Sequence, residues 1–190
     1  MEKGFSSEYK PFSRASNNES VWNDINISIV PTLGGAAVPA TIAFNGSTRL
    51  KCLAFSGTNP TPDELPSSLE VLHGYKEGSS IRLHIHGYAT TATVANVKLQ
   101  LAYTWFNRDS VPPAETVVSQ TFATLGTAWQ EQTTTFIIAP AGQKMGSRFV
   151  FSLFRDSQDV ADTYAAPYAF TDVGIHYEDD SVGSRQIGVK

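Results

Sequence analysis

The chain has 190 residues, a length that fits one domain or one domain with a short arm and that can bury a substantial core. Charged residues are 17% and aromatic residues 11%, a balance typical of short strands and polar turns rather than long charged helices. The formal net charge is −4 and no Lys/Arg cluster exceeds two residues, which excludes a concentrated positive surface for nucleic acid.

No run of about 18 apolar residues occurs, so membrane insertion is not expected. The N-terminal stretch lacks the apolar segment of a secretory signal, which predicts synthesis in a cytosol. The single cysteine, Cys52, lies in an alternating stretch and is expected to be a small buried thiol in a strand.

Residues 1–20 are polar and show no periodicity, which indicates an extended N-terminal arm or a disordered segment. From residue 21 onward, short alternating segments are separated by turn residues, the pattern of repeated strands. We expect strands at residues 22–30, 41–44, 50–55, 69–72, 80–88, 95–106, 116–123, 130–139, 148–154 and 168–177.

Turn residues divide these segments. Asn45-Gly46 is a strong hairpin signal because both residues tolerate positive φ. Residues 57–66 contain three prolines, which predicts a long loop outside any ladder. Residues 157–166 have room for a single helical turn at most.

About ten strands at intervals of 8–12 residues predict an all-β fold, an antiparallel two-sheet β-sandwich of jelly-roll type. The domain is expected to span residues 21–190, after the arm. A sandwich has to protect its edge strands, and closure by three sister copies is one solution, so a homotrimer is expected.

His84 and His86 are the best candidates for a chemical site. Residues at i and i+2 of a strand point to the same face, so the two rings can share one metal ion. The spacing after Gly78 resembles the first half of the cupin metal motif, but Thr90 and Thr91 stand where its glutamate belongs. We therefore expect no metal and no cofactor. His84, His86 and His176 remain weak metal candidates, and hydrogen-bonded, partly buried histidines are the favoured interpretation.

The other catalytic patterns are weaker still. Asp156, Asp159 and Asp162 recur every three residues but lack the Asp/Asn alternation and glycine of a calcium loop, so a solvated loop is favoured. No Gly-x-Ser-x-Gly elbow and no glycine-rich phosphate loop occurs. The chain is not expected to be an enzyme.

Aromatic residues suggest a different kind of site. Tyr103 and Trp105 lie in apolar alternation and are expected in the core. Trp129 and Tyr164 stand among loop residues and are the pair expected to be exposed, which would suit contact with a glycan.

Three ordered segments resemble virion structural proteins of tailed phages. They are Val21-Trp22-Asn23-Asp24-Ile25, then Leu72-His73-Gly74-Tyr75-Lys76-Glu77-Gly78 followed by His84-Ile85-His86, and Ile175-His176-Tyr177-Glu178-Asp179-Asp180-Ser181-Val182-Gly183-Ser184-Arg185-Gln186. The chain departs from that pattern at Gly87, where relatives tend to carry a bulky aromatic residue, and at Leu83, often proline.

The resemblance implies a non-enzymatic particle component, usually trimeric. It is expected to be a tail fibre or appendage protein, or alternatively a capsid decoration protein at threefold positions, made in the bacterial host cytoplasm and located in the virion. The implied partners are its own copies, a tail adaptor, collar or major capsid protein, and host surface glycan. The arm and closing segment would supply assembly contacts, through Tyr9, Phe12, Arg14 and Arg185. The alternatives from other classes are a cupin-like metal protein and a carbohydrate-binding jelly roll.

Overall fold

A computed structural model of the protein describes residues 21–27 and 37–179. Within these ranges the chain forms ten strands and one 3-10 turn, η1 (Phe44–Gly46). The strands are β1 (Val21–Asn26), β2 (Ala40–Ala43), β3 (Lys51–Phe55), β4 (Asp63–Glu70), β5 (Ile81–Ala89), β6 (Asn96–Phe106), β7 (Thr116–Ala123), β8 (Glu131–Ile138), β9 (Arg148–Arg155) and β10 (Tyr168–Asp179).

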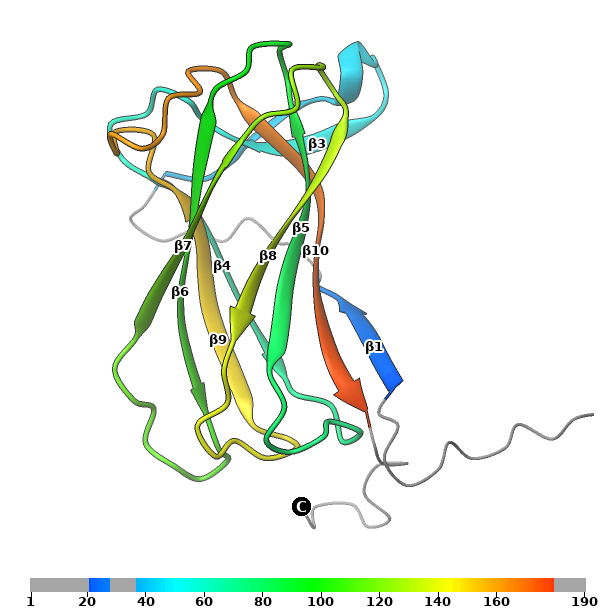
Figure 1. Cartoon of the computed structure of the whole chain (residues 1–190), viewed down its shortest axis with the longest axis vertical. Helices are drawn as coiled ribbons and strands as arrows, with labels where there is room; N and C mark the ends of the chain where they lie inside the picture. The colour runs from blue at the N-terminus through cyan, green and yellow to red at the C-terminus, as the bar shows by residue number, and fades with distance from the viewer. Residues whose placement is uncertain (1–20, 28–36, 180–190) are drawn as a thin grey trace, which may run out of the picture.

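The strands form two antiparallel sheets that face each other (Figure 1). The six-stranded sheet has the order β2-β3-β10-β5-β8, with β1 added to β10. The four-stranded sheet has the order β4-β9-β6-β7. The predicted all-β sandwich of jelly-roll type is therefore confirmed.

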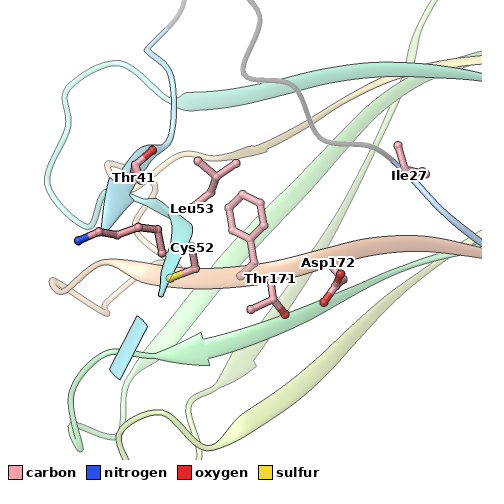
Figure 2. Close-up of a pocket in the computed structure, with 8 residues that line it drawn as sticks. Ile27, Thr41, Cys52, Leu53, Thr171 and Asp172 are labelled. Carbon is pink, nitrogen blue, oxygen red and sulfur yellow. The ribbon is translucent and has the colours of Figure 1, made fainter. Parts of the chain in front are cut away.

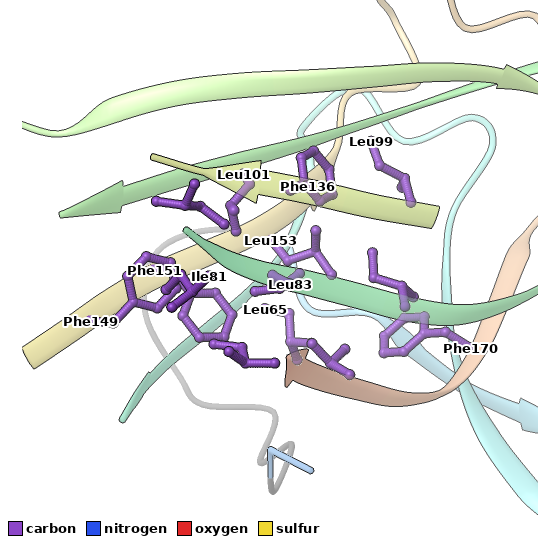
Figure 3. Packing of buried hydrophobic residues seen from close by; sticks show 14 of the residues in the cluster. Leu65, Ile81, Leu83, Leu99, Leu101, Phe136, Phe149, Phe151, Leu153 and Phe170 are labelled. Carbon is purple, nitrogen blue, oxygen red and sulfur yellow. The ribbon is translucent and has the colours of Figure 1, made fainter. Parts of the chain in front are cut away.

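The core fills the space between the sheets because one face of each strand is apolar (Figure 3). On β6, Val97, Leu99 and Leu101 are fully buried, and Trp105 is 3% exposed, as expected for that strand. The Trp105 indole Nε1 donates a 2.8 Å hydrogen bond to Ser147 Oγ, so its polar group is satisfied inside the core. Cys52 is buried, as predicted.

Strand β4 corrects the expected proline-rich loop. The ladder to β9 begins at Asp63 and runs through Pro66, which lies opposite Ser152. Proline is tolerated there because β4 is at the edge of its sheet, so the missing N–H does not interrupt a second ladder. The Asn45-Gly46 hairpin is present between β2 and β3, with positive φ at both residues.

Several expectations lie outside the described residues. These include the arm at residues 1–20, the proposed assembly contacts Tyr9, Phe12, Arg14 and Arg185, and the end of the first expected strand at residues 28–30. In the described ranges, no helix has the length and apolar character needed to span a membrane.

The loop after β9 also differs from the expected solvated loop. The side chain of Asp162 is 1% exposed and accepts two 2.8 Å hydrogen bonds from Arg155, whose side chain is fully buried. Asp159 pairs with Lys98, and no helical turn forms over residues 157–166. Two of the three regularly spaced aspartates therefore hold the loop against β6 and β9 through cationic partners.

Gly87 has a steric explanation. It lies on the core face of β5, and a Cβ added there would come within 2.3 Å of the Tyr168 hydroxyl and 2.5 Å of its ring. Tyr168 is fully buried on the neighbouring β10. The ring of Tyr168 from β10 fills the core space beside Gly87, so there is no room for the bulky aromatic residue that the resemblance implies at position 87.

This arrangement predicts strong coupling between positions 87 and 168. We expect Gly87→Phe to destabilise the fold by about 1–3 kcal/mol or more through overpacking. Combined with Tyr168→Ala, which opens the same space, it should cost about 1–3 kcal/mol less than the sum of the single changes. Chemical denaturation of the four proteins measures this. Gly87→Phe combined with Ile138→Val, which lies opposite Ile81 at the far end of β5, is the control and should be additive.

Candidate functional site

The candidate site lies on the outer face of the six-stranded sheet. Along β5, Ile81, Leu83 and Ile85 enter the core, so the alternate residues point away from it. These outward residues are Arg82, His84, His86 and Tyr88. The prediction that His84 and His86 share a face is confirmed, with ring centroids 5.1 Å apart.

Strand register brings a third histidine and a carboxylate to the same place. His176 of β10 lies opposite Arg82 of β5 on one side and opposite Asp24 of β1 on the other. His176 Nε2 is 3.5 Å from Asp24 Oδ2, and its ring centroid is 4.2 Å from that of His84. Ligating atoms of Asp24, His84 and His176 all lie within 4.8 Å of one another.

Gly174 makes this approach possible. It lies opposite His84, and a Cβ there would meet His84 Cε1 at 2.5 Å, His84 Nε2 at 2.7 Å and Asp24 Oδ1 at 3.1 Å. Because position 174 has no side chain, the His84 ring lies over β10 and reaches toward β1. Gly174 of β10 thus lets side chains from β5 and β1 approach each other across its strand.

His84 is only 3% exposed, and its Nδ1 has no hydrogen-bond partner in the structure. Burial lowers the pKa of His84 below 6.5, and repulsion from His176 lowers it further. Asp24 and Asp172 oppose the shift, and His86 adds to it. The imidazole is therefore held neutral at neutral pH, the form in which a histidine can bind a metal ion.

His86 is engaged differently. Its Nδ1 is 2.8 Å from Glu131 Oε1, and the Tyr88 hydroxyl donates to Glu131 Oε2 at 3.1 Å. These two hydrogen bonds lower the pKa of the Glu131 carboxyl. His86 thus belongs to a polar network with β8, and the ligand cluster pairs His84 with His176 and Asp24 instead.

The two aromatic residues expected on the surface have different environments. Tyr164 is 1% exposed, and its hydroxyl accepts a 2.9 Å hydrogen bond from the Thr91 N–H, so its expected exposure is wrong. Trp129 is half-buried and packs its ring 5.2 Å from Phe44 on the outer face. The more exposed tryptophan is Trp22, 46% exposed, with the Arg82 guanidinium 4.6 Å from its ring centroid.

A groove opens on the six-stranded sheet where β10 changes partner (Figure 2). The ladder from β10 to β3 ends at Phe170, and the ladder to β1 starts at Gly174. The groove is lined by Ile27, Thr41, Lys51, Cys52, Leu53, Phe170, Thr171 and Asp172. Burial raises the pKa of the Cys52 thiol, which disfavours the nucleophilic thiolate form.

The described parts of the three segments of the phage resemblance meet at one corner of this sheet, which we call the three-segment corner. The first segment, residues 21–25, lies in β1 and pairs with residues 175–179 of β10, the described part of the third segment. The turn at residues 72–78 meets the same end of β10, where the Lys76 N–H donates to Glu178 O at 2.8 Å. Its ammonium group donates to Glu178 Oε2, also at 2.8 Å.

The Asp179 carboxylate lies at the centre of the three-segment corner. Asn23 Nδ2 of the first segment donates to Asp179 Oδ2 at 3.4 Å. A Cβ at Gly74 of the second segment would come within 2.4 Å of the same oxygen, so only glycine leaves the carboxylate its place. Segments far apart in the sequence therefore build one continuous structural unit.

Sequence reasoning did not single out Gly174, Glu131 or the pairing of Asp24 with His176. Ile25 and Ile27 alternate with Asp24 and pack against the core, so Asp24 points outward from its strand. Only the pairing of β1 with β10 shows which histidine it meets.

No protein-family model and no curated protein matches this chain. Among solved structures, it is similar to the CBM22-2 xylan-binding domain of Paenibacillus barcinonensis Xyn10C, with 16% identity, TM-score 0.42, and 82% of this chain and 91% of that one covered. It is also similar to a family 11 carbohydrate-binding module from Clostridium thermocellum, with 13% identity, TM-score 0.38 and coverages of 85% and 92%. A third is TmCBM61, with 11% identity, TM-score 0.38 and coverages of 83% and 88%. Likeness at this level carries no ligand or function over to this chain.

Proposed function

We propose that this chain is a non-enzymatic structural component of a tailed-phage particle, a tail fibre or appendage protein or, alternatively, a capsid decoration protein. The observation that carries the proposal is the three-segment corner. A chance resemblance would scatter its matching residues over the fold, whereas the described parts of the three segments contact one another through β1, β10 and the turn before β5. They form a framework rather than a cleft with a nucleophile and a base.

Exposed apolar side chains support assembly with sister copies. Ile137 of β8 is 62% exposed and Val117 of β7 is 48% exposed, each on the edge strand of its sheet. The two edges are neighbours, since Gln132 Nε2 of β8 donates to Ala123 O of β7 at 2.9 Å. Natural sandwiches protect such edges, and a threefold contact would cover both at once.

Particle composition tests the virion role. We expect quantitative mass spectrometry of purified phage particles encoding this chain to detect it in fixed ratio to the major capsid protein. On the order of tens of copies fit an appendage, and hundreds fit decoration of capsid threefold positions. Its absence from particles in which the other structural proteins are detected would rule out the proposal.

Solution mass tests the trimer separately. The untagged full chain should have about three times the 20.6 kDa mass of one copy by light scattering. Val117→Lys with Ile137→Lys should shift it toward the monomer, because charges would then be buried at the contact. Val160→Lys is the matched control, since Val160 is 96% exposed in the loop between β9 and β10 and should leave the trimer intact. A monomeric wild-type chain contradicts the trimer only.

A second candidate function is contact with carbohydrate on the outer face of the six-stranded sheet. Trp22 and Trp129 offer aromatic surface there, and Glu131 and Asp172 offer acceptors for sugar hydroxyls. Aromatic faces stack on the apolar face of a sugar ring, and nearby carboxylates fix its orientation. In a phage appendage, such a face would meet a host surface glycan.

Glycan-array binding of the full chain tests this second candidate. If a glycan binds, Trp22→Ala or Trp129→Ala should weaken binding by roughly tenfold or more through lost stacking. Ser119→Ala on β7 of the opposite sheet should leave the affinity unchanged. Binding that survives both tryptophan changes excludes this face as the glycan site.

A further inference from the structure

We propose that Asp24, His84 and His176 bind one divalent transition-metal ion of the zinc class, which links β1, β10 and β5. The first argument is geometric. One ligating atom from each residue lies within 4.8 Å of the others. A zinc ion at about 2.0–2.2 Å from each ligand needs them about 3–3.5 Å apart, a difference that small side-chain rotations close.

The residues that must rotate are free to do so. The side chains of Asp24 and His176 are 47% and 45% exposed, so they can adjust and also leave an open path for the ion. His84 is the fixed ligand, because its ring is buried over Gly174. The site thus combines one rigid imidazole with two adjustable ligands on neighbouring strands.

The state of His84 is the second, independent argument. Buried polar atoms in folded proteins nearly always have a partner, yet Nδ1 of this 3% exposed ring has none in the structure. An imidazole that is buried and has an unpaired nitrogen, beside a carboxylate and a second imidazole, has the chemistry of a metal ligand. A histidine kept only for packing would be expected to donate to a nearby carbonyl or carboxylate.

The donor set selects the class of ion. Two imidazoles and one carboxylate favour zinc and its transition-metal neighbours over calcium or magnesium, which prefer oxygen ligands. Three protein ligands leave a further coordination position on the exposed side. The nearby cation, Arg82, is held over the Trp22 ring, and Asp24 supplies negative charge to the cluster.

Such an ion would stabilise the attachment of β1 to the rest of its sheet. In the described part of the chain, β1 pairs with one strand only, β10. A metal held by Asp24, His176 and His84 would connect β1 through β10 to β5, which is paired on both sides. The ion would thereby stabilise the three-segment corner, and this role stands whether or not the chain belongs to a virion.

Zinc titration of the untagged full chain, stripped with chelator, tests the proposal. We expect one zinc ion per chain by calorimetry and elemental analysis, with a dissociation constant on the order of 1 µM or tighter. Zinc should also raise the melting temperature of the wild-type protein. Asp24→Asn and His176→Gln should each weaken binding by at least about 100-fold and remove the thermal shift.

His86→Ala and His73→Ala are the matched controls, because His86 bonds to Glu131 and His73 lies beside Glu70. Both should keep stoichiometric binding. The positions changed in Asp24→Asn and His176→Gln are half-exposed, so circular dichroism should show intact sheets. These two variants decide the outcome without any change at the buried His84. The proposal is overturned if wild type binds no stoichiometric zinc. It is also overturned if those two variants bind normally, or if His86→Ala abolishes binding.

Discussion

The fold depends most on the pairing of β10. Along one edge this strand pairs with β5, and along the other it pairs first with β3 and then with β1. Its core-facing side chains, Tyr168, Phe170, Val173, Ile175 and Tyr177, are all buried, so the same strand also supplies much of the interior. Because one edge of β10 serves two partners in turn, the sheet has a groove at the change of partner and a polar cluster beyond it. Both features of the outer face follow from this division.

Close approach at glycine is the second constraint. Gly174 lets the His84 ring cross β10 toward Asp24, and Gly87 gives its core space to Tyr168. In each case the side chain that occupies the space above the glycine comes from the adjacent strand, His84 from β5 and Tyr168 from β10. The absence of a side chain at these two glycines therefore helps to position the His84 ring on the outer face and the Tyr168 ring in the core. Substitution at either glycine would disturb residues that are remote in the sequence.

The proposed assembly contact and the proposed metal site lie on different strands of the domain. Exposed apolar residues lie on the edge strands β7 and β8, while the histidine cluster lies between β1, β10 and β5. A particle protein needs a rigid domain with protected sheet edges. A metal ion that connects β1 to β10 and β5 would make the three-segment corner more rigid. The tryptophans of the outer face could contact a glycan on the same domain. These roles are compatible, and each has its own test.

The sequence by itself determined the fold class, most of the strands and the shared face of His84 and His86, because the period-two alternation of a strand is a local property. It misplaced β4, since proline is excluded from a ladder only where the strand has neighbours on both sides. It also misjudged Tyr164 and Asp162, whose burial depends on a loop folding back over β9 and β6. The meeting of Asp24, His84 and His176 was decided by tertiary structure alone. The register between strands that are far apart in the chain sets which side chains become neighbours. The alternation within one strand does not predict that register.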